Sequence, residues 1–524
     1  MANSIKRNTV YNIIKTLSTI IFPLITFPYA SRALGVVNIG KVNFAASIIS
    51  YISLLATLGI STYAIRACSC CKDEKLLLSQ TASEIFSINI FSTVLAYIVL
   101  LGLLVFWKKL NPYKTLILLY SINVLMTTLG ADWINSAMED FRYITLRTFV
   151  CQILSLVLMF VFIHKPEHYV IYTCISVISA SGGNLVNIFY RRKYCKICFV
   201  GFRKVRNCNC DAAISTCDGE LNNNNKADKY RLGGIRWKQH LPPIMLLFSM
   251  LIAQTIFVSV DTTMLGIIRG DREVGLYSTS TKIYNMVNQV VASIAWVVMP
   301  QLSFLFKKVP DDKKTGINNL EVYEEINKLL HYSLNFIIVV GLPCVVGLFT
   351  LAPEVIELVG GKTYMDAVPS LRILCVALAV SFIAGFYGNI ILLPSGREKI
   401  CLTVCVCSAL INLVLNFILI PRWGLNAAAF TTLISQIVCL VGELPFIEKE
   451  IKVGNILKMF LAPVVGSIGI VVLVLLIKYI GCSLLLRSLI SVFSSAAFYI
   501  FILLVLKNEF AMNILKALKE RFFL

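Results

Sequence analysis

Ionisable and amide side chains interrupt long apolar stretches of this sequence, and they are its main candidates for chemistry. Within 276–302, polar residues recur at intervals of four, three and four: Ser278, Lys282, Asn285 and Gln289. This spacing places them on one face of an α-helix over about three turns. Because such a face is costly against lipid, we expect it to line a hydrated path or to pack against polar groups.

Other apolar stretches carry residues of the same kind, and together they define a candidate substrate path. Its members are Lys15, Arg32, Asp261, Lys282, Asn285, Gln289, Arg372, Asn412 and Asn416. Lysine and arginine in a low-dielectric cavity attract anions. Basic residues within the apolar stretches outnumber the acidic pair Asp261 and Glu443, and this balance favours an anionic substrate.

Six of the nine path residues also have a purely structural interpretation. Asp261 and Lys282 fall at a similar expected depth and can pair with each other, while proton or sodium coupling is a third alternative for them. Arg32 and Arg372 lie near helix ends, where a long side chain reaches the interface. Asn412 and Asn416 can join helices by hydrogen bonds.

The sequence shows no motif typical of catalysis or of a cofactor site. It lacks a glycine-rich phosphate loop, a catalytic triad and a metalloprotease helix. Cys195-Lys-Ile-Cys198 resembles half of a zinc site, but Cys208 and Cys210 downstream are separated by a single residue. We therefore expect no enzyme active site, no metal site and no cofactor, with the coupling ion (H⁺ or Na⁺) left open.

Membrane-spanning helices must position these residues. Hydrophobic residues make up 57% of the 524 positions and charged residues 15%, with a mean hydropathy of +0.79. A soluble domain has about 45–50% hydrophobic residues and about 25% charged residues. A helix crosses the hydrocarbon with about 20 apolar residues. The sequence therefore predicts an all-α integral membrane protein of about fourteen transmembrane helices, at 10–30, 42–64, 83–106, 114–133, 145–163, 169–190, 241–266, 276–302, 331–352, 368–393, 399–420, 424–445, 457–480 and 484–506.

Six of the expected spans precede a polar stretch, and the other eight follow it. We expect an N-terminal lobe at 1–190, a basic cytoplasmic loop at 191–240 and a second part at 241–524, whose first helix completes the first lobe. The stretch 191–238 holds 12 of the 48 Lys and Arg residues, and positive charge marks the cytoplasmic side. This rule places both termini in the cytoplasm. It also explains the net charge of +20 without a nucleic-acid partner.

Three stretches resemble the polysaccharide flippases of the multidrug/oligosaccharidyl-lipid/polysaccharide (MOP) exporter superfamily. They are Pro28-Tyr-Ala-Ser-Arg-Ala-Leu-Gly35 with Gly40 and Arg66; Asp261-Thr-Thr-Met-Leu-Gly266 with Glu273 and Tyr277; and Leu393-Pro-Ser-Gly396 with Asn412, Asn416, Gly424 and Ala427-Ala-Ala-Phe-Thr431. The long loop at 191–238, rich in cysteine and asparagine, departs from the family pattern.

The resemblance implies two lobes around a central cavity, as in MATE transporters, and alternating access. It implies translocation of a polyprenyl-pyrophosphate-linked oligosaccharide from the cytoplasmic to the outer leaflet of a bacterial cell membrane, for surface polysaccharide export. The implied partners are this substrate, membrane lipids and a polysaccharide polymerase machinery. One alternative is a MATE-type ion-coupled antiporter of drugs or metabolites. Another, a membrane polymerase or glycosyltransferase, fits poorly because the sequence predicts no long outer loop.

Overall fold

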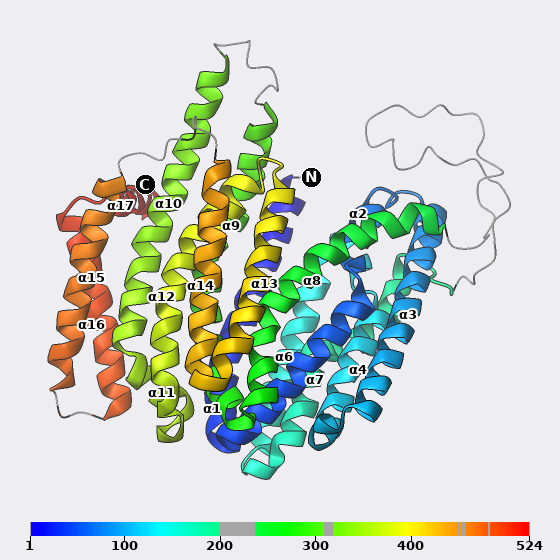
Figure 1. Ribbon diagram of the computed structural model, residues 1–524. Helices are drawn as coiled ribbons and strands as arrows, with labels where there is room; N and C mark the ends of the chain where they lie inside the picture. Colours follow the sequence, from blue (N-terminus) through cyan, green and yellow to red (C-terminus); the bar gives the residue numbers. More distant parts are fainter. Residues whose placement is uncertain are drawn as a thin grey trace. The chain divides into compact units, whose positions relative to one another are not determined.

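The chain folds into α-helices joined by short turns (Figure 1). The computed structural model describes residues 2–199, 236–308, 318–447, 451, 456–479, 481 and 483–522, and within these ranges it contains no β-strand. Twelve candidate spans among these residues are long and apolar enough to cross a membrane. The predicted all-α, multi-pass membrane fold is therefore confirmed.

The predicted number of fourteen spans is not confirmed, and the difference arises at two places. Helix α1 (Ala2–Thr57) and helix α2 (Ile60–Ser69) contribute to one candidate span of 49 residues, where the sequence predicts two. Helix α4 (Lys114–Gly130) has 17 residues, fewer than the about 20 that the hydrocarbon core requires.

Helix α1 is kinked at Gly35, whose φ of 76° and ψ of 168° are not helical. This region of φ favours glycine, so the motif residue Gly35 allows the chain to change direction here. The same place divides the chain into compact units. Unit 1 comprises Met1–Leu34 and Lys41–Ser259, and unit 2 comprises Gly35–Gly40 and Val260–Leu524.

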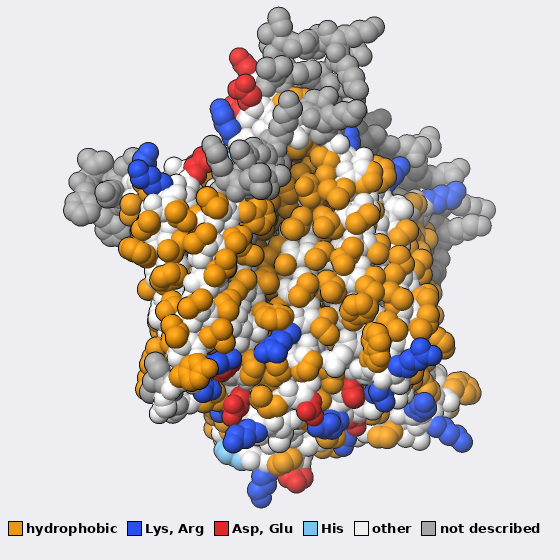
Figure 2. Space-filling model, turned by 60° about the vertical axis from the view of Figure 1, so that its left-hand side comes forward, with side chains coloured by type: hydrophobic (Ala, Val, Ile, Leu, Met, Phe, Trp, Pro, Cys, Tyr) orange, Lys and Arg blue, Asp and Glu red, His pale blue; other side chains and the backbone are white. Residues whose placement is uncertain are grey.

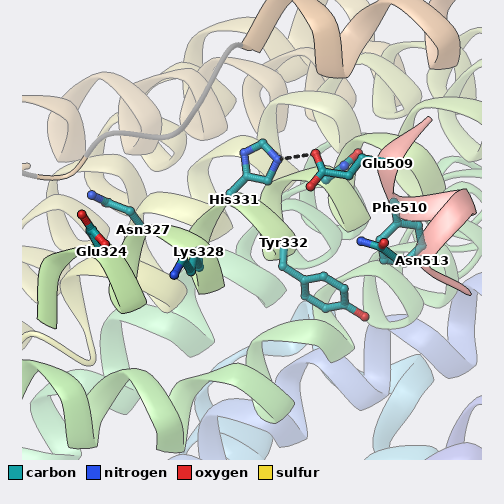
Figure 3. Close-up of a pocket in the computed structure, with 9 residues that line it drawn as sticks. Glu324, Asn327, Lys328, His331, Tyr332, Glu509, Phe510 and Asn513 are labelled. Atoms are coloured by element: carbon teal, nitrogen blue, oxygen red, sulfur yellow. Dashed lines mark hydrogen bonds and ion pairs between the residues drawn. The ribbon is translucent and has the colours of Figure 1, made fainter. Parts of the chain in front are cut away.

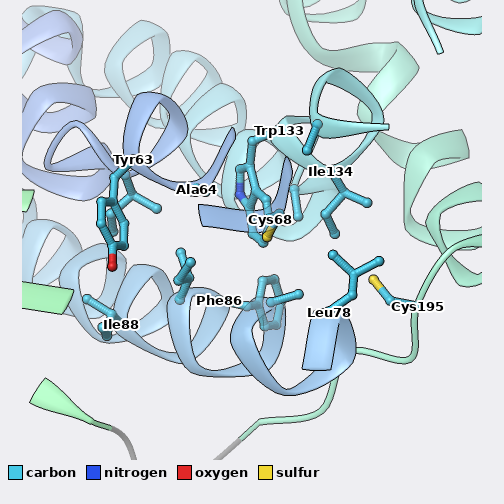
Figure 4. Close-up of a cluster of buried hydrophobic side chains, with 14 of the residues drawn as sticks. Tyr63, Ala64, Cys68, Leu78, Phe86, Ile88, Trp133, Ile134 and Cys195 are labelled. Carbon is cyan, nitrogen blue, oxygen red and sulfur yellow. The ribbon is translucent and has the colours of Figure 1, made fainter. Parts of the chain in front are cut away.

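Unit 1 contains α1 except for Gly35–Gly40, together with α2 and α4. Its further helices are α3 (Lys75–Phe106), α5 (Trp133–Ala137), α6 (Phe141–Phe162), α7 (Tyr169–Tyr190) and α8 (Trp237–Ile268), the last up to Ser259. A buried apolar cluster joins α2, α3 and α5 (Figure 4). Tyr63 and Cys68 come from α2, Leu78 from α3 and Trp133 from α5, and Cys195 joins them from the segment after α7.

A buried ionic network fixes the beginning of α8 to α2 and α3. The Glu84 carboxylate lies 3.0 Å from the Arg236 Nε atom and 3.0 Å from His240 Nε2. His240 Nδ1 in turn lies 2.8 Å from the Tyr63 hydroxyl. Glu84 and His240 are each only 2% exposed, so this network carries charge into the interior of unit 1.

Unit 2 contains the remaining long helices. They are α9 (Asp271–Lys308), α10 (Asn318–Thr350), α11 (Ala352–Gly360), α12 (Val368–Gly385), α13 (Glu398–Trp423), α14 (Leu425–Glu443), α15 (Ile456–Lys478), α16 (Leu484–Val505) and α17 (Glu509–Phe522). Helix α14 packs against α12 and α13, α15 packs against α16 and α10, and α12 ends in a π-helical turn at Phe386–Leu392.

The outer surface of the helices is apolar. Figure 2 shows a broad belt of hydrophobic side chains on one face, with charged side chains gathered below it. Large apolar residues such as Trp296, Phe417 and Phe493 are more than two-thirds exposed. A water-facing protein rarely exposes apolar patches of this extent, whereas a lipid-facing surface requires them.

Gly424 and Glu273, both in the resembling motifs, act together at the beginning of α14. The Glu273 Oε2 atom accepts a hydrogen bond from the Leu425 backbone N–H at 2.7 Å. Gly424 has a φ of 55°, and a Cβ atom there would lie 2.6 Å from Glu273 Oε2. The glycine therefore permits both the turn and the close approach of the capping carboxylate.

We expect Gly424→Ala to destabilise the protein by about 1–3 kcal/mol, because the new methyl group meets a left-handed backbone and the Glu273 carboxylate. Denaturant unfolding of the purified protein in detergent measures this change. Gly347→Ala is the matched control, since nothing lies within 4 Å of a Cβ atom at that helical glycine. Equal stability of the two variants would contradict the proposed role of Gly424.

Glu84→Ala is expected to destabilise unit 1 by about 3 kcal/mol, because it leaves the buried His240 and the partly buried Arg236 without their shared carboxylate. The same unfolding measurement applies, with the exposed Asp73→Ala as control. A loss no larger than that of the control would show that the network contributes little to stability.

Candidate functional site

A buried carboxylate, Asp261, lies at the centre of a hydrogen-bonded network in unit 2. Its Oδ2 atom accepts hydrogen bonds from the Tyr277 hydroxyl at 2.7 Å and from the Thr432 hydroxyl at 2.8 Å. Its Oδ1 atom accepts one from Asn416 Nδ2 at 2.5 Å. Asp261 is 4% exposed, and these donors come from three other helices, α9, α14 and α13.

A second layer of hydrogen bonds orients the first. Asn416 Nδ2 also donates to Asn412 Oδ1, one helical turn earlier on α13, at 2.9 Å. The Thr431 hydroxyl of α14 donates to Asn416 Oδ1 at 2.7 Å. Asn412, Asn416 and Thr431 are all buried, so the network is held in one arrangement by helix packing and by its own hydrogen bonds.

Each group that donates to Asp261 is neutral. Among the described residues, no ion pair includes Asp261, so the pairing with Lys282, one of the alternatives open from the sequence, is not seen in this structure. A carboxylate buried without a counter-charge is costly. Uptake of a proton or of a small cation would neutralise it, and the oxygen atoms of Asp261, Asn412 and Thr432 are the type of ligand that hard cations prefer.

The polar face predicted on 276–302 exists on α9, but its members differ in their surroundings. Ser278 is buried, and its hydroxyl oxygen has no hydrogen-bond partner. Lys282 is half-buried, while Asn285 and Gln289 are exposed. The face therefore begins near Asp261 and runs along α9 toward residues that the rest of the structure leaves uncovered.

Neither Arg32 nor Arg372 is among the donors to Asp261. Arg372 lies in the first turns of α12 with its guanidinium carbon 5.5 Å from the centre of the Phe349 ring, and its Nε atom is buried without a hydrogen-bond partner. Arg32 is exposed in unit 1. The side chain of Lys15 lies outside the described part of the structure. Of the nine candidate path residues, the structure brings together Asp261, Asn412 and Asn416.

A second carboxylate, Glu443, is also buried in unit 2. It lies at the end of α14 beside Gly388 of the π-helical turn, where a Cβ atom would approach its Oε1 atom to 2.5 Å. Its Oε2 atom has no hydrogen-bond partner. Asp261 and Glu443 are thus both buried, and neither forms an ion pair with another described residue.

Sequence reasoning alone did not assign Tyr277 and Thr432 to this site. Tyr277 belongs to a resembling motif, but nothing in its spacing connects it with Asp261, sixteen residues earlier on another helix. Thr432 directly follows the last resembling motif, and a threonine is an ordinary residue in a membrane helix. The sequence marks both only as polar residues inside apolar helices. That signal does not show that their hydrogen-bond partner is Asp261.

The cysteines whose spacing resembles part of a zinc site divide between described and undescribed residues. Cys195 is buried in the apolar cluster of unit 1, and Cys198 is exposed. Cys208, Cys210 and Cys217 lie outside the described residues, as does most of the expected loop. In the ranges that the structure describes, no group of three His, Cys, Asp or Glu side chains could hold a metal ion.

Family models match both halves of the chain. One described as a polysaccharide biosynthesis protein matches residues 5–212, and one described as the lipid II flippase MurJ matches residues 236–501. A putative O-antigen transporter of Shigella dysenteriae is 20% identical over 82% of this chain and 96% of its own length. The capsular polysaccharide biosynthesis protein CapF of Staphylococcus aureus is 22% identical over 79% of this chain and 91% of its own length.

Solved structures show the same fold at low identity. The lipid II flippase MurJ in an inward closed conformation matches with a TM-score of 0.66 and 16% identity, over 97% of this chain and 100% of that one. An inward-facing MATE family transporter of the MOP superfamily matches with a TM-score of 0.54 and 14% identity, over 83% of this chain and 93% of that one. The predicted MATE-like fold is confirmed. Because the MurJ model covers slightly more than half of the 524 residues, the chain belongs to the MurJ family and thereby to the flippases of the MOP superfamily, which are transporters and not enzymes.

Proposed function

We propose that this protein translocates a polyprenyl-pyrophosphate-linked oligosaccharide from the cytoplasmic to the outer leaflet, for export of a surface polysaccharide. The observation that carries the proposal is a buried carboxylate network inside a bundle of apolar helices from the MurJ family. The relatives named for O-antigen transport and capsule biosynthesis support an oligosaccharide as the cargo.

In this proposal the two compact units are the two lobes of the transporter, and α8 completes the first lobe. Movement of the lobes exposes the substrate path to one side of the membrane and then to the other. The protein lies in a bacterial cell membrane with both termini in the cytoplasm, as the distribution of Lys and Arg indicates. A polysaccharide polymerase is the expected recipient of the flipped substrate.

The Asp261 network is the proposed coupling site. A carboxylate on α8 with neutral donors on three other helices changes its charge when it takes up a proton or a cation, and the preferred packing of these four helices then changes with it. Asn412 and Asn416 belong to this site. An ion gradient can therefore favour one conformation over the other without any contact between the ion and the oligosaccharide.

The substrate path is proposed to run along the polar face of α9. Lys282 lies between the buried Asp261 network and the exposed Asn285 and Gln289, which suit the hydroxyl groups of sugars. Lys15, Arg32 and Arg372 supply further positive charge. A pyrophosphate carries negative charge, and a lysine in a low-dielectric path attracts it strongly.

Reconstituted protein should move a lipid-linked oligosaccharide across proteoliposome membranes, and Lys282→Ala should slow this movement about tenfold, the effect of losing about 1.4 kcal/mol of interaction. Accessibility of the sugar to an added lectin or glycosidase measures it. Lys399→Ala, at an exposed position of α13, is the matched control. Movement that Lys282→Ala leaves unchanged would keep the function and exclude Lys282 from the path. Absence of movement, with efflux of small cations, would instead indicate a MATE-type antiporter.

Asp261→Asn should abolish the response of transport to an imposed H⁺ or Na⁺ gradient, because the neutral amide has no charge to compensate. The protein should remain folded, since Tyr277 and Thr432 can reorient their hydroxyl groups to accept hydrogen bonds. Flipping rates with and without each gradient test this. Asp366→Asn, at an exposed carboxylate that pairs with Arg272, is the control. A folded Asp261→Asn protein that responds fully to both gradients would refute the coupling role.

A further inference from the structure

The π-helical turn after α12, Phe386–Leu392, lies against Glu443 of α14 at Gly388. A Cβ atom added to Gly388 would lie 2.5 Å from Glu443 Oε1 and 3.3 Å from its Oε2. The glycine therefore leaves the space that the carboxyl group occupies, and we call this space the Glu443 niche. π-Helical turns are rare, and they occur frequently at functional sites.

Three helical segments close the niche. The Gly388 carbonyl of the π-helical turn accepts a hydrogen bond from the Cys401 thiol of α13 at 3.8 Å. Next to Glu443, Gly442 packs so closely on α13 that a Cβ atom there would lie 3.0 Å from a Val404 methyl group. Because the turn, α13 and α14 meet in this way, Glu443 is only 7% exposed.

No described side chain provides a counter-charge for the Glu443 carboxyl group. The titratable side chains around the niche are Cys401, Cys405, Cys439 and Tyr387. Arg397, at the beginning of α13, donates to the Phe446 carbonyl, and Arg372 lies at the other end of α12. Glu443 belongs to no ion pair of the described residues, and its Oε2 atom has no hydrogen-bond partner.

Other carboxylates of the described chain have partners or contact solvent. Three further carboxylates are buried, and each accepts hydrogen bonds or pairs with a cation: Glu84, Asp261 and Glu354. The Glu509 side chain is 67% exposed and lies 3.2 Å from His331, at an open cavity of about 500 Å³ between α10 and α17 (Figure 3). An ionised carboxylate in the position of Glu443 is costly, and uptake of a proton removes that cost.

A buried stripe of polar side chains connects the niche with the Asp261 network. On α14 it follows intervals of four residues, at Thr431, Ser435, Cys439 and Glu443. On α13 it comprises Ser408, Asn412 and Asn416. The Ser408 hydroxyl donates to the Ser435 carbonyl at 2.7 Å, and the Thr431 hydroxyl donates to Asn416 Oδ1 at the other end. Helix α14 thus carries Glu443 at its end and the threonines of the Asp261 network about three turns earlier.

We propose that Glu443 is a proton-binding site, with its carboxyl group protonated in the niche. Thiols and apolar groups line this niche, whereas the oxygen atoms around Asp261 also suit a metal cation. Loss of the proton as the pH rises places a negative charge against Gly388, which this packing of α14 does not accommodate. In the proposed transporter the displaced α14 disturbs the Asp261 network, and flipping slows. This last step rests on the proposed function.

Infrared spectroscopy of the full-length protein in lipid tests the proton directly. The carbonyl band of a protonated carboxyl group should be present near neutral pH, should disappear at alkaline pH, and should be absent from Glu443→Gln. Glu398→Gln, at an exposed position of α13, is the control and should keep the band, because an ordinary exposed glutamate is almost fully ionised near neutral pH. Equal bands in wild-type protein and folded Glu443→Gln would overturn the proposal.

A glycine pair tests the niche. Gly388→Ala should weaken the band about tenfold near neutral pH, the effect of about one pH unit on a single ionising group, because its methyl group drives the carboxyl group toward water. Gly385→Ala is the matched control, since its Cβ atom meets only Asn389 Nδ2 at 3.6 Å. Equal loss of the band in both variants would refute the role of the niche. The Glu443→Gln comparison tests the proton even if Gly388→Ala does not fold.

Flipping at equal pH on both sides of the membrane tests the link to transport. The rate should fall about tenfold per pH unit once Glu443 ionises, as for a single titrating group. Glu443→Gln should lose this decline, and Glu443→Asp, which keeps a carboxyl group, should retain it. A decline that Glu443→Gln leaves unchanged would refute the link. The infrared band is measured without substrate, so a protein that flips no oligosaccharide would refute the proposed function and leave the proton site standing.

Discussion

Hydrocarbon offers no hydrogen-bond partner, and this constraint shapes the whole chain. Each backbone polar group must be satisfied within its own segment, which is why the described spans are helices. The same constraint applies to side chains. Ser and Thr hydroxyl groups along the helices donate back to carbonyls one turn earlier, as Ser83 and Ser87 do on α3. A charged or amide side chain within a span therefore has to find partners on neighbouring helices.

The two buried carboxylates of the described networks meet this requirement in different ways. Glu84 in unit 1 has a cationic partner, Arg236, and a histidine, and it joins the beginning of α8 to α2 and α3. Asp261 in unit 2 has neutral donors alone. The first arrangement is a fixed ion pair typical of a structural role. The second leaves a charge to be compensated, and a transporter can use such a charge to respond to an ion gradient.

The Asp261 network lies where α8, α9, α13 and α14 meet inside unit 2. The oxygen atoms gathered there suit a proton or a small cation. Asn416, one of the donors, is fully buried, so helix packing rather than loop conformation positions its amide.

The sequence by itself determined the class of fold, since a composition this apolar and spans of this length exclude a soluble domain. It also identified Asp261, Asn412 and Asn416 as unusual, because polar residues inside apolar helices are costly wherever they lie. Tertiary structure alone decided their partners. Helical periodicity defines faces within one helix, but the register between α8, α9, α13 and α14 depends on packing. That register gave Asp261 the hydroxyl groups of Tyr277 and Thr432 instead of the ammonium group of Lys282.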